Sequence, residues 1–518
     1  MFFTIYKRRK KMRYLHVELP SLHLVWKRPG KKDWVCSVIR TNYPKPSALL
    51  VSAIMREAGF EVKVVDMKIH NQDTITPYRE FTYEDGLMIA SRKGMIFEEV
   101  NEEIRWAEVI GLTINPTSWA NIALDFVKHA KSINPKIKVW VGGTDPTFRP
   151  NFYLKQGVDA VIRGEGEDLA DKLLTNSSAC GVTTNNMDNG IARGCDLDRS
   201  PLQALDLFKE DIPLWNTPIE GWNLLDHNIQ PPIGFLFATR GCNQRCAYCT
   251  TPAKYGALRF KSLAKIKAEL EHFKAYGIKT INIWDDSLSS LIKLGRKEHL
   301  LNIVRLLKSM GFAYEFSQGM VIKDLWDKQN NKPDEELISE LFGHEIHNGQ
   351  WVGCYAEYFP FEFLQYEDPR GAAQKLMSYD KELKVMETIL EQGIRWLTYS
   401  CILGRPEDGP KEFQLATQRL NEVTAIIESY GAMGLPTPFM YSVFPGAKLW
   451  KTQPVKLNYE INEYPELYQL NATPHGTTFF TPGELMEAKK ELEKNVLTPN
   501  QCKRLWSEGR YTWKKPVV

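Results

Sequence analysis

The sequence predicts an α/β protein with two domains, each built around a parallel sheet that helices cover. Three observations predict this fold class. The chain has 518 residues, more than one ordinary core holds, and its composition is globular, with 43% hydrophobic and 25% charged residues. Short apolar strand patterns alternate with helical patterns in two separate sets. A polar stretch with scattered prolines divides the two sets.

The first set predicts a domain over residues 13–170. Residues 47–59 and 118–135 repeat their apolar positions at helical spacing, and Gly59 ends the first of these helices. We expect a long loop after the first strand and an irregular stretch after the second. Apolar strands that alternate with helices predict a parallel sheet covered on both faces. The apolar runs place its strands at 13–20, 60–66, 107–114, 136–143 and 157–167.

Small and polar residues follow four of these strands, at the edge where parallel sheets bind ligands. Glycines there allow close backbone approach, and hydroxyls offer hydrogen bonds. Each segment alone reads as an ordinary strand-to-helix turn, whereas four at one edge favour a large ligand. No G-x-G-x-x-G opens a helix after the first strand, which argues against a dinucleotide. The candidate ligand-binding residues are Asp66, Thr113, Asn115, Thr117, Ser118, Gly142, Gly143, Thr144, Gly164, Glu165 and Gly166.

The second set predicts a partial (β/α)6 barrel over residues 233–450. Helical patterns such as 262–277 and 381–393 separate its strands. Barrels of this kind carry their chemistry at the carboxyl ends of the strands. The expected strands lie near 233–241, 279–285, 313–320, 350–357, 396–403 and 436–443.

Two further segments complete the predicted organisation. Residues 171–232 read as a linker, and residues 451–518 as a small C-terminal helical extension. In that extension Thr481, Pro482 and Glu484 predict a helix start with a capping box.

Charge and cysteine use exclude several classes of protein. The chain has 66 basic and 63 acidic residues, so its net charge of +3 indicates no nucleic-acid partner. No apolar run is long enough to span a membrane. The basic start, "MFFTIYKRRKKMRY", has no apolar core after it, which argues against a secretory signal and favours a solvated tail. Six cysteines are scattered, as in reduced proteins, and we expect a cytoplasmic location.

The other three cysteines lie close together, and three readings of them compete. Cys242, Cys246 and Cys249 follow the first strand of the second domain. A structural zinc ordinarily takes four ligands, and no further cysteine lies between Cys249 and Cys354. A disulfide would leave an odd thiol. An iron–sulfur cubane on three thiolates leaves one iron open to bind a substrate, and the number of ligands favours this reading.

The segment "CNQRCAYC" resembles the CxxxCxxC signature of the radical S-adenosylmethionine (SAM) superfamily. Later segments are similar to the strand ends of its barrel, namely "INIWDDSLSS", "EFSQGM", "GCYAEYF", "LGRPEDG" and "FPGAKLW". The segments "VIGLTINPTS", "VWVGGTDPT" and "VDAVIRGEGE" resemble the Rossmann-like cobalamin-binding domain that precedes the barrel in one large subgroup. The two resemblances together cover residues 13–450.

This resemblance implies three cofactors and their ligands. Cys242, Cys246 and Cys249 are expected to hold a [4Fe–4S] cluster, whose open iron binds SAM. Tyr248, Asp286, Ser317 and Glu357 are the candidates for contacts to SAM, although capping a turn would explain each of the polar ones as well. The first domain is expected to bind cobalamin. An external one-electron reductant such as flavodoxin or ferredoxin is also implied.

The resemblance favours a methyltransferase. It implies that a 5′-deoxyadenosyl radical removes hydrogen from an unactivated carbon and that methylcobalamin delivers a methyl group derived from SAM. One alternative is a radical rearrangement, cyclisation or oxidation without methyl transfer. Another is a module that binds a corrinoid or zinc without catalysis. The Asp-x-His-x-x-Gly signature is absent, so we expect no histidine beneath cobalt: His23 reads as a loop residue, and His70 has the wrong spacing.

The sequence does not define the substrate, which is expected to be a small molecule or a peptide. The aromatic residues of 351–363 either line a pocket or pack in the core, and core packing is the better prediction. The segment around His475 reads as a surface loop rather than a lid over the site.

Overall fold

The computed structural model describes residues 11–36, 46–167, 179–215, 231–368, 375–452 and 455–497. The basic start up to residue 10 and Cys502 lie outside these residues. The chain divides into two compact units: one holds residues 1–22, 43–78 and 91–212, and the other holds residues 23–42, 79–90 and 213–518. The predicted domain boundaries at 170, 232 and 450 stay predictions.

The first unit contains the predicted parallel sheet. Its helices include α1 (Pro46–Glu57), α2 (Asn101–Trp106), α3 (Ala120–Ile133), α4 (Thr144–Phe148) and α5 (Pro150–Leu154). In space the parallel strands run β4-β1-β7-β8-β9, so the strand order reverses between β1 and β7, which is where such sheets bind ligands. Their bounds are β1 (Arg13–Glu18), β4 (Glu61–Asp66), β7 (Val109–Thr113), β8 (Lys138–Gly142) and β9 (Ala160–Ile162).

Part of the expected linker belongs to this same sheet. Strands β10 (Val182–Thr184) and β11 (Met187–Asp188) continue it beyond β9 in antiparallel fashion. Three short 3-10 helices follow, at Leu197–Arg199, Leu205–Phe208 and Ile212–Leu214. The stretch is polar and rich in turns, so its sequence does not show the short strands β10 and β11. These strands form only because they pair with β9 and with each other.

A second, four-stranded sheet occupies segments that were expected to be irregular. Its order is β3-β2-β6-β5. His23, expected in a loop, therefore lies in a strand. The strand bounds are β2 (Ser21–Lys27), β3 (Trp34–Val35), β5 (Ile75–Tyr83) and β6 (Gly86–Lys93).

The second unit contains the partial barrel. Six strands pair in the order β12-β15-β16-β20-β21-β22, and each of these pairings is parallel. Five of the six barrel strands form at the predicted places, whereas the sixth lies at Met433–Pro436, almost entirely before the predicted residues 436–443. Their bounds are β12 (Ile233–Leu236), β15 (Thr280–Ile283), β16 (Ala313–Phe316), β20 (Gln350–Glu362), β21 (Trp396–Leu403) and β22 (Met433–Pro436).

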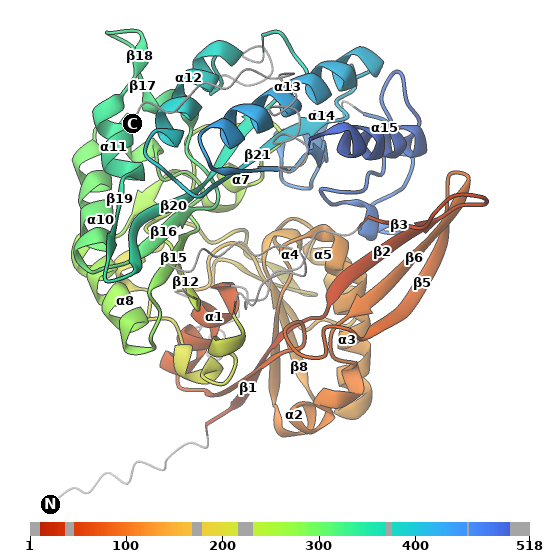
Figure 1. The fold of residues 1–518 in the computed structure, drawn as a ribbon. Coiled ribbons are helices and arrows are strands. Elements are labelled where there is room, and N and C mark those ends of the chain that lie inside the picture. Colours follow the sequence, from red (N-terminus) through yellow and green to blue (C-terminus); the bar gives the residue numbers. More distant parts are fainter. Residues whose placement is uncertain are drawn as a thin grey trace, which may run out of the picture. The chain divides into compact units, whose positions relative to one another are not determined.

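Helices cover the outer face of the barrel strands (Figure 1). The longer ones are amphipathic; in α10, for example, Leu300, Ile303, Val304 and Leu307 are buried at helical spacing. The helices are α7 (Thr251–Tyr255), α8 (Leu263–Ala275), α9 (Ser290–Lys293), α10 (Lys297–Ser309), α11 (Glu335–Phe342), α12 (Tyr379–Leu390), α13 (Pro410–Ser429) and α14 (Lys448–Thr452). Short strands complete the unit: β13 (Thr239–Arg240), β14 (Arg259–Phe260), β17 (Trp326–Asp327), β18 (Lys332–Pro333), β19 (His344–His347) and β23 (Phe439–Met440).

The fourth barrel strand carries an irregularity near its carboxyl end. The register between β20 and β21 shifts between Pro360 and Glu362. Proline has no N–H for the ladder, and bulges of this kind bend a strand and redirect its side chains. The aromatic residues Trp351, Tyr355, Phe359, Phe361 and Phe363 of this region are buried, which confirms the prediction of core packing.

The C-terminal extension packs on the four-stranded sheet. Helix α15 (Pro482–Asn495) begins with the predicted capping box between Thr481 and Glu484. The Tyr83 hydroxyl donates to the Thr473 carbonyl at 2.8 Å, and the Glu84 amide donates to the Tyr459 hydroxyl at 2.9 Å. No helix among the described residues has the length and apolarity that crossing a bilayer requires.

The segment around His475 is not a surface loop, contrary to expectation. His475 is fully buried, and its two ring nitrogens lie 2.9 Å from the Gly476 carbonyl and 2.8 Å from the Tyr441 carbonyl.

Candidate functional site

The three clustered cysteines lie in one loop after the first barrel strand. The loop follows β13, which pairs with β14, and it ends at α7. It therefore stands at the carboxyl end of the barrel strands, where such folds place their chemistry.

Two residues with left-handed backbone shape this loop. Gly241, just before Cys242, has φ +89°, and a Cβ atom there would stand 2.6 Å from the Ala257 carbonyl oxygen. Only glycine fits such a position without strain. Arg245, just before Cys246, also has positive φ (54°). Within the loop, the Cys249 amide donates to the Cys246 carbonyl at 3.2 Å.

Neighbouring side chains hold the loop from both sides. The Asp286 carboxylate accepts the Gly241 amide at 3.0 Å and the Thr251 hydroxyl at 3.2 Å, which are the residues that flank the cysteines. Asp285 is buried and accepts the amide of Thr239 at 2.5 Å and its hydroxyl at 2.9 Å. Burial raises the pKa of Asp285 to about 7, against the lowering effect of the hydrogen bonds from Thr239. The aspartate pair thus positions the loop.

The three thiols of the loop are partly accessible. Cys242, Cys246 and Cys249 are all half-buried. Among the residues that the structure describes, no three His, Cys, Asp or Glu side chains gather as ligands of one metal ion. Burial raises the pKa of the Cys246 and Cys249 thiols, which iron would deprotonate on binding.

Tyr248, predicted to contact SAM, is anchored by its hydroxyl. It donates to the carboxylate of Glu362, which also pairs with Lys375. The Tyr248 ring meets the Phe363 ring edge-on at 6.0 Å between centroids. The backbone beside it is also fixed, because the Leu449 amide donates to the Ala247 carbonyl at 3.0 Å.

A polar network continues from the strands that follow. Ser317 donates to the side-chain oxygen of Asn282, and the Asn282 amide group donates to Glu315. Glu315 is half-buried, and burial raises its pKa to about 7. Glu357 on β20 is 2% exposed: one of its oxygens accepts the Met320 amide at 3.1 Å, and the other has no hydrogen-bond partner among the described residues. Burial raises the pKa of Glu357 well above its usual range.

The predicted SAM-binding residues therefore divide into two groups. Ser317 directly follows β16, whereas Glu357 lies inside the neighbouring strand β20 rather than at its end, as the register pair of Phe316 and Glu357 shows. Asp286 instead holds the cysteine loop. The unpartnered oxygen of Glu357 is a ready acceptor for a ligand.

The strand ends of the first unit lie side by side as predicted. Register pairs join Thr113 to Gly142 and Gly142 to Ile162, so the loops after β7, β8 and β9 share one edge. Asp66 pairs instead with Glu18, on the far side of β1 from β7.

A buried aspartate joins the first two of these loops. Asp145 accepts the Thr117 hydroxyl at 2.6 Å, the Arg149 guanidinium at 2.8 Å and the Tyr153 hydroxyl at 2.5 Å. Above it, the Thr144 amide donates to the Asn115 side chain at 3.2 Å. Asn115 is exposed and Ser118 is buried in the same loop. Hydroxyl and amide groups thus surround the point where the strand order reverses, which fits a ligand with many polar groups such as cobalamin.

The predicted glycines play different roles. At Gly143 and Gly164 a Cβ atom would stand 2.4 Å from the Ile114 oxygen and 2.1 Å from the Ala192 oxygen, so the chain itself needs these two glycines. Gly142 has only an ordinary contact at 3.5 Å, and Gly166 faces open space. These two leave room for a ligand.

Two of the predicted acidic residues accept hydrogen bonds from backbone amides of the chain. Glu165 accepts the Cys195 amide at 2.9 Å, and Asp66 accepts the Lys68 amide at 2.9 Å.

Three contributors to these sites were missed in the sequence. Asp145 lies in the quoted "GGTDPT" segment, and its partner Arg149 follows one helical turn later, a spacing that signals an ion pair. Glu362, like Glu357, is an acid among aromatic residues, and Pro360 within a strand was the only sign of a bulge there. Lys375 carries no signal of its own.

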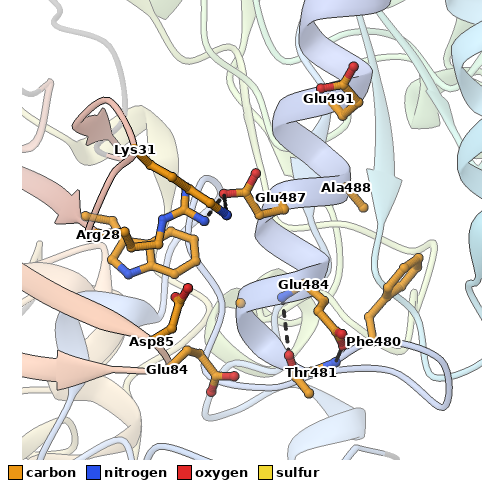
Figure 2. A pocket seen from close by; sticks show the side chains of 12 residues that line it. Arg28, Lys31, Glu84, Asp85, Phe480, Thr481, Glu484, Glu487, Ala488 and Glu491 are labelled. Carbon is orange, nitrogen blue, oxygen red and sulfur yellow. Dashed lines mark hydrogen bonds and ion pairs between the residues drawn. The ribbon is translucent and has the colours of Figure 1, made fainter.

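A cavity of about 630 Å³ lies elsewhere in the second unit. It opens between α15 and the turns of the four-stranded sheet (Figure 2). Arg28 and Lys31 face Glu487 across it, and Glu84 and Asp85 stand below them. None of the predicted site residues lines this cavity.

Two family models match the chain. The B12 binding domain model matches residues 33–174, and the Radical SAM superfamily model matches residues 236–325.

Among curated proteins, the chain is similar to an uncharacterised methyltransferase of Pyrococcus horikoshii, with 24% identity over 66% of this chain and 69% of the relative. It is also similar to cytidylyl-2-hydroxyethylphosphonate methyltransferase of Streptomyces wedmorensis, with 21% identity over 56% of this chain and 57% of the relative. Among solved structures, the fold is similar to that of the radical SAM methyltransferase TsrM of Kitasatospora setae with cobalamin and a [4Fe–4S] cluster bound. That match has a TM-score of 0.60 and 13% identity, and it covers 94% of this chain and 89% of TsrM.

Proposed function

We propose that the chain is a radical SAM enzyme with a B12-binding domain and that it moves a methyl group from SAM through cobalamin to an unactivated carbon of a small molecule. One observation carries the proposal. The chain combines a positioned three-cysteine loop at the carboxyl end of a parallel barrel with a polar ligand edge at the switch point of a second parallel sheet. The methyltransferase relatives support the same class of reaction.

The second unit is assigned the iron–sulfur cluster and SAM. Cys242, Cys246 and Cys249 would hold the cluster, and Asp286 would keep their loop in place through Gly241 and Thr251. When bound, the cluster supplies the electron for radical cleavage of SAM, and cobalamin supplies a carrier for the methyl group.

Polar groups of two neighbouring barrel strands are assigned to SAM. Glu357 offers its unpartnered oxygen, and Ser317 stands at the end of the neighbouring strand. Tyr248, fixed by Glu362, presents its ring beside the cysteines.

The first unit is assigned cobalamin. Asn115, Thr117, Ser118 and Thr144 supply polar contacts at the switch point, and Gly142 and Gly166 leave space for the ring. Asp145 holds the loops that carry these residues. The remaining candidates are assigned contacts within the chain that shape the same edge of the sheet. They are Thr113, Gly143, Gly164, Glu165 and Asp66.

The substrate is proposed to be a small molecule, and the electron donor an external reductant such as flavodoxin or ferredoxin. Of the relatives, TsrM has been solved with a tryptophan substrate and a SAM analogue bound, in a match with a TM-score of 0.57 and 14% identity. That likeness supports the size of the substrate and not its identity.

The test begins with anaerobic purification and reconstitution of the native chain and of Cys246→Ala. We expect about four irons and one corrinoid in the native chain, with the iron lost in the variant. Equal amounts of iron in both proteins, or zinc in place of iron, would contradict the assignment. Formation of S-adenosylhomocysteine together with 5′-deoxyadenosine separates methyl transfer from rearrangement, because only methyl transfer yields S-adenosylhomocysteine.

A further inference from the structure

Lys375 has no role in the reaction proposed above, and Glu362 enters it only by fixing Tyr248, yet both are linked to the cysteine loop. The Glu362 carboxylate accepts the Tyr248 hydroxyl through one oxygen and pairs with the Lys375 ammonium through the other. Tyr248 stands between Cys246 and Cys249 in the sequence. A chain of contacts therefore runs from Lys375 through Glu362 to the middle of the loop.

The backbone at Glu362 is in an uncommon conformation. Its φ is +61°, in the left-handed region, and it follows the register shift that begins at Pro360. For a residue other than glycine this conformation costs about 1 kcal/mol or more, so surrounding contacts must maintain it. Bulges beside functional sites redirect side chains. Here the bulge directs a carboxylate, 6% exposed, to Tyr248.

Lys375 is also held in place. Leu376 and Met377 after it are buried, and the Met377 amide donates to Glu382 of α12 at 3.1 Å. The Lys375 side chain is 17% exposed. Burial acts to lower the pKa of Lys375, but the negative charge of Glu362 raises it above its usual range. Lys375 is therefore a half-buried cation that is linked to the cysteine loop through Glu362 and Tyr248.

We propose that Glu362 and Lys375 are positioning residues for the iron–sulfur cluster, in which Glu362 fixes both Lys375 and Tyr248 and so holds the positive charge of Lys375 near the cysteine loop. The inference rests on the proposed function, because it requires that the cysteines hold a cluster. A positive charge close to a cluster favours its reduced form, and a negative charge disfavours it. Lys375 thus raises the midpoint potential of the cluster, and Glu362 moderates that effect.

The test measures the midpoint potential of the reconstituted full-length protein by redox titration with electron paramagnetic resonance. Lys375→Met removes the positive charge, and we expect a lower potential. Glu362→Gln keeps nearly the same shape but leaves Lys375 without its counter-charge, and we expect a higher potential. Lys375→Arg keeps the charge and is expected to retain the native potential. Lys489→Met removes a lysine of α15 that is only 1% exposed, and it serves as the control for loss of a buried lysine.

Opposite shifts in Lys375→Met and Glu362→Gln, at native iron content, would support the proposal, because a merely structural role cannot move the potential both ways. Unchanged potentials in both variants, or shifts in the same direction, would overturn it. If Lys375→Met loses its iron, the potential of Glu362→Gln decides, and a value at or below the native one rejects the proposal. Absence of iron from the native protein would instead reject the proposed function, so the two failures are distinguishable.

Discussion

Gly241 shows how strongly a single residue fixes the cysteine loop. Its positive φ and the 2.6 Å approach to the Ala257 oxygen leave no room for a side chain. We expect Gly241→Ala to destabilise the protein by about 1–3 kcal/mol and to lower its iron content, because the loop must shift to accept the methyl group. Thermal unfolding and iron analysis measure the two effects.

Gly277→Ala is the matched control for this change. Gly277 also has positive φ (75°), but nothing lies within 4 Å of its added Cβ atom. It is expected to lose some stability and to keep its iron. Equal iron content in the two variants would show that the fit at Gly241 does not govern the loop.

Glu315 makes the stability of the barrel depend on pH. Its pKa is raised from 4.5 to about 7 by burial, so the folded state holds the proton more tightly than the unfolded state does. The contribution of Glu315 to stability is therefore full below about pH 4.5, falls as the pH rises through 7, and is constant above that.

Glu315→Gln should remove this dependence. Between pH 5 and pH 8 the native chain should lose up to about 3 kcal/mol of its free energy of unfolding through Glu315. The variant should not show this loss. Urea unfolding of both proteins at several pH values measures the difference. A difference that does not change with pH would mean that Glu315 titrates normally.

Single residues were predicted well where their spacing along the sequence identifies them. The spacing of the three cysteines identifies them in the sequence. Glu362 reaches the same site only through a bulge, and Lys375 only through a turn that precedes α12. Glu165 was predicted to bind a ligand because it ends a strand, yet its carboxylate accepts the Cys195 amide. A polar residue at a strand end thus indicates which edge of the sheet is functional. It does not show whether the side chain contacts a ligand or another part of the chain.

On the scale of elements, Asp145 connects the loops after β7 and β8. Removing it in Asp145→Ala would leave Arg149, which is 8% exposed, without its carboxylate, and a buried charge left in this way costs about 3–5 kcal/mol. We expect weaker corrinoid binding, measured by absorbance titration, with unchanged iron content. Glu269→Ala is the control, because it breaks a comparably buried pair with Lys261 (2.6 Å) in the barrel. Corrinoid binding lost equally in both variants would point to general instability.

Elements were predicted well where apolar periodicity was strong. The five parallel strands of the first sheet and five of the six barrel strands form where they were predicted, because buried parallel strands read as continuous apolar runs. The sheet of β2, β3, β5 and β6 was missed for the opposite reason: its strands are partly exposed, and their burial comes from residues far away in the chain. Residues 182–188 were taken for linker because edge strands are short and polar.

On the scale of the whole molecule, the C-terminal helix α15 packs against the four-stranded sheet. The Arg28 side chain is 2% exposed, stacks on Trp26 at 3.8 Å and pairs with Glu487 of α15. Glu487 is itself 35% exposed, so we expect Glu487→Ala to cost about 1–3 kcal/mol. The first cleavage sites in limited proteolysis should move to α15.

Glu491→Ala is the matched control, one helical turn further along α15. Glu491 pairs with the exposed Lys494, and its loss should leave the proteolysis pattern unchanged. Identical patterns for the two variants would mean that Arg28 does not hold the helix.

The division of the chain also has a consequence for its synthesis. The backbone passes from one unit to the other five times, and the Tyr83 hydroxyl meets a carbonyl 390 positions later in the sequence. Because a ribosome releases the chain from its first residue onward, the early sheet leaves the exit tunnel long before the helix that covers it. A nascent chain stalled before residue 455 would carry that sheet uncovered, so the sheet completes its packing only after the segment that covers it has been made.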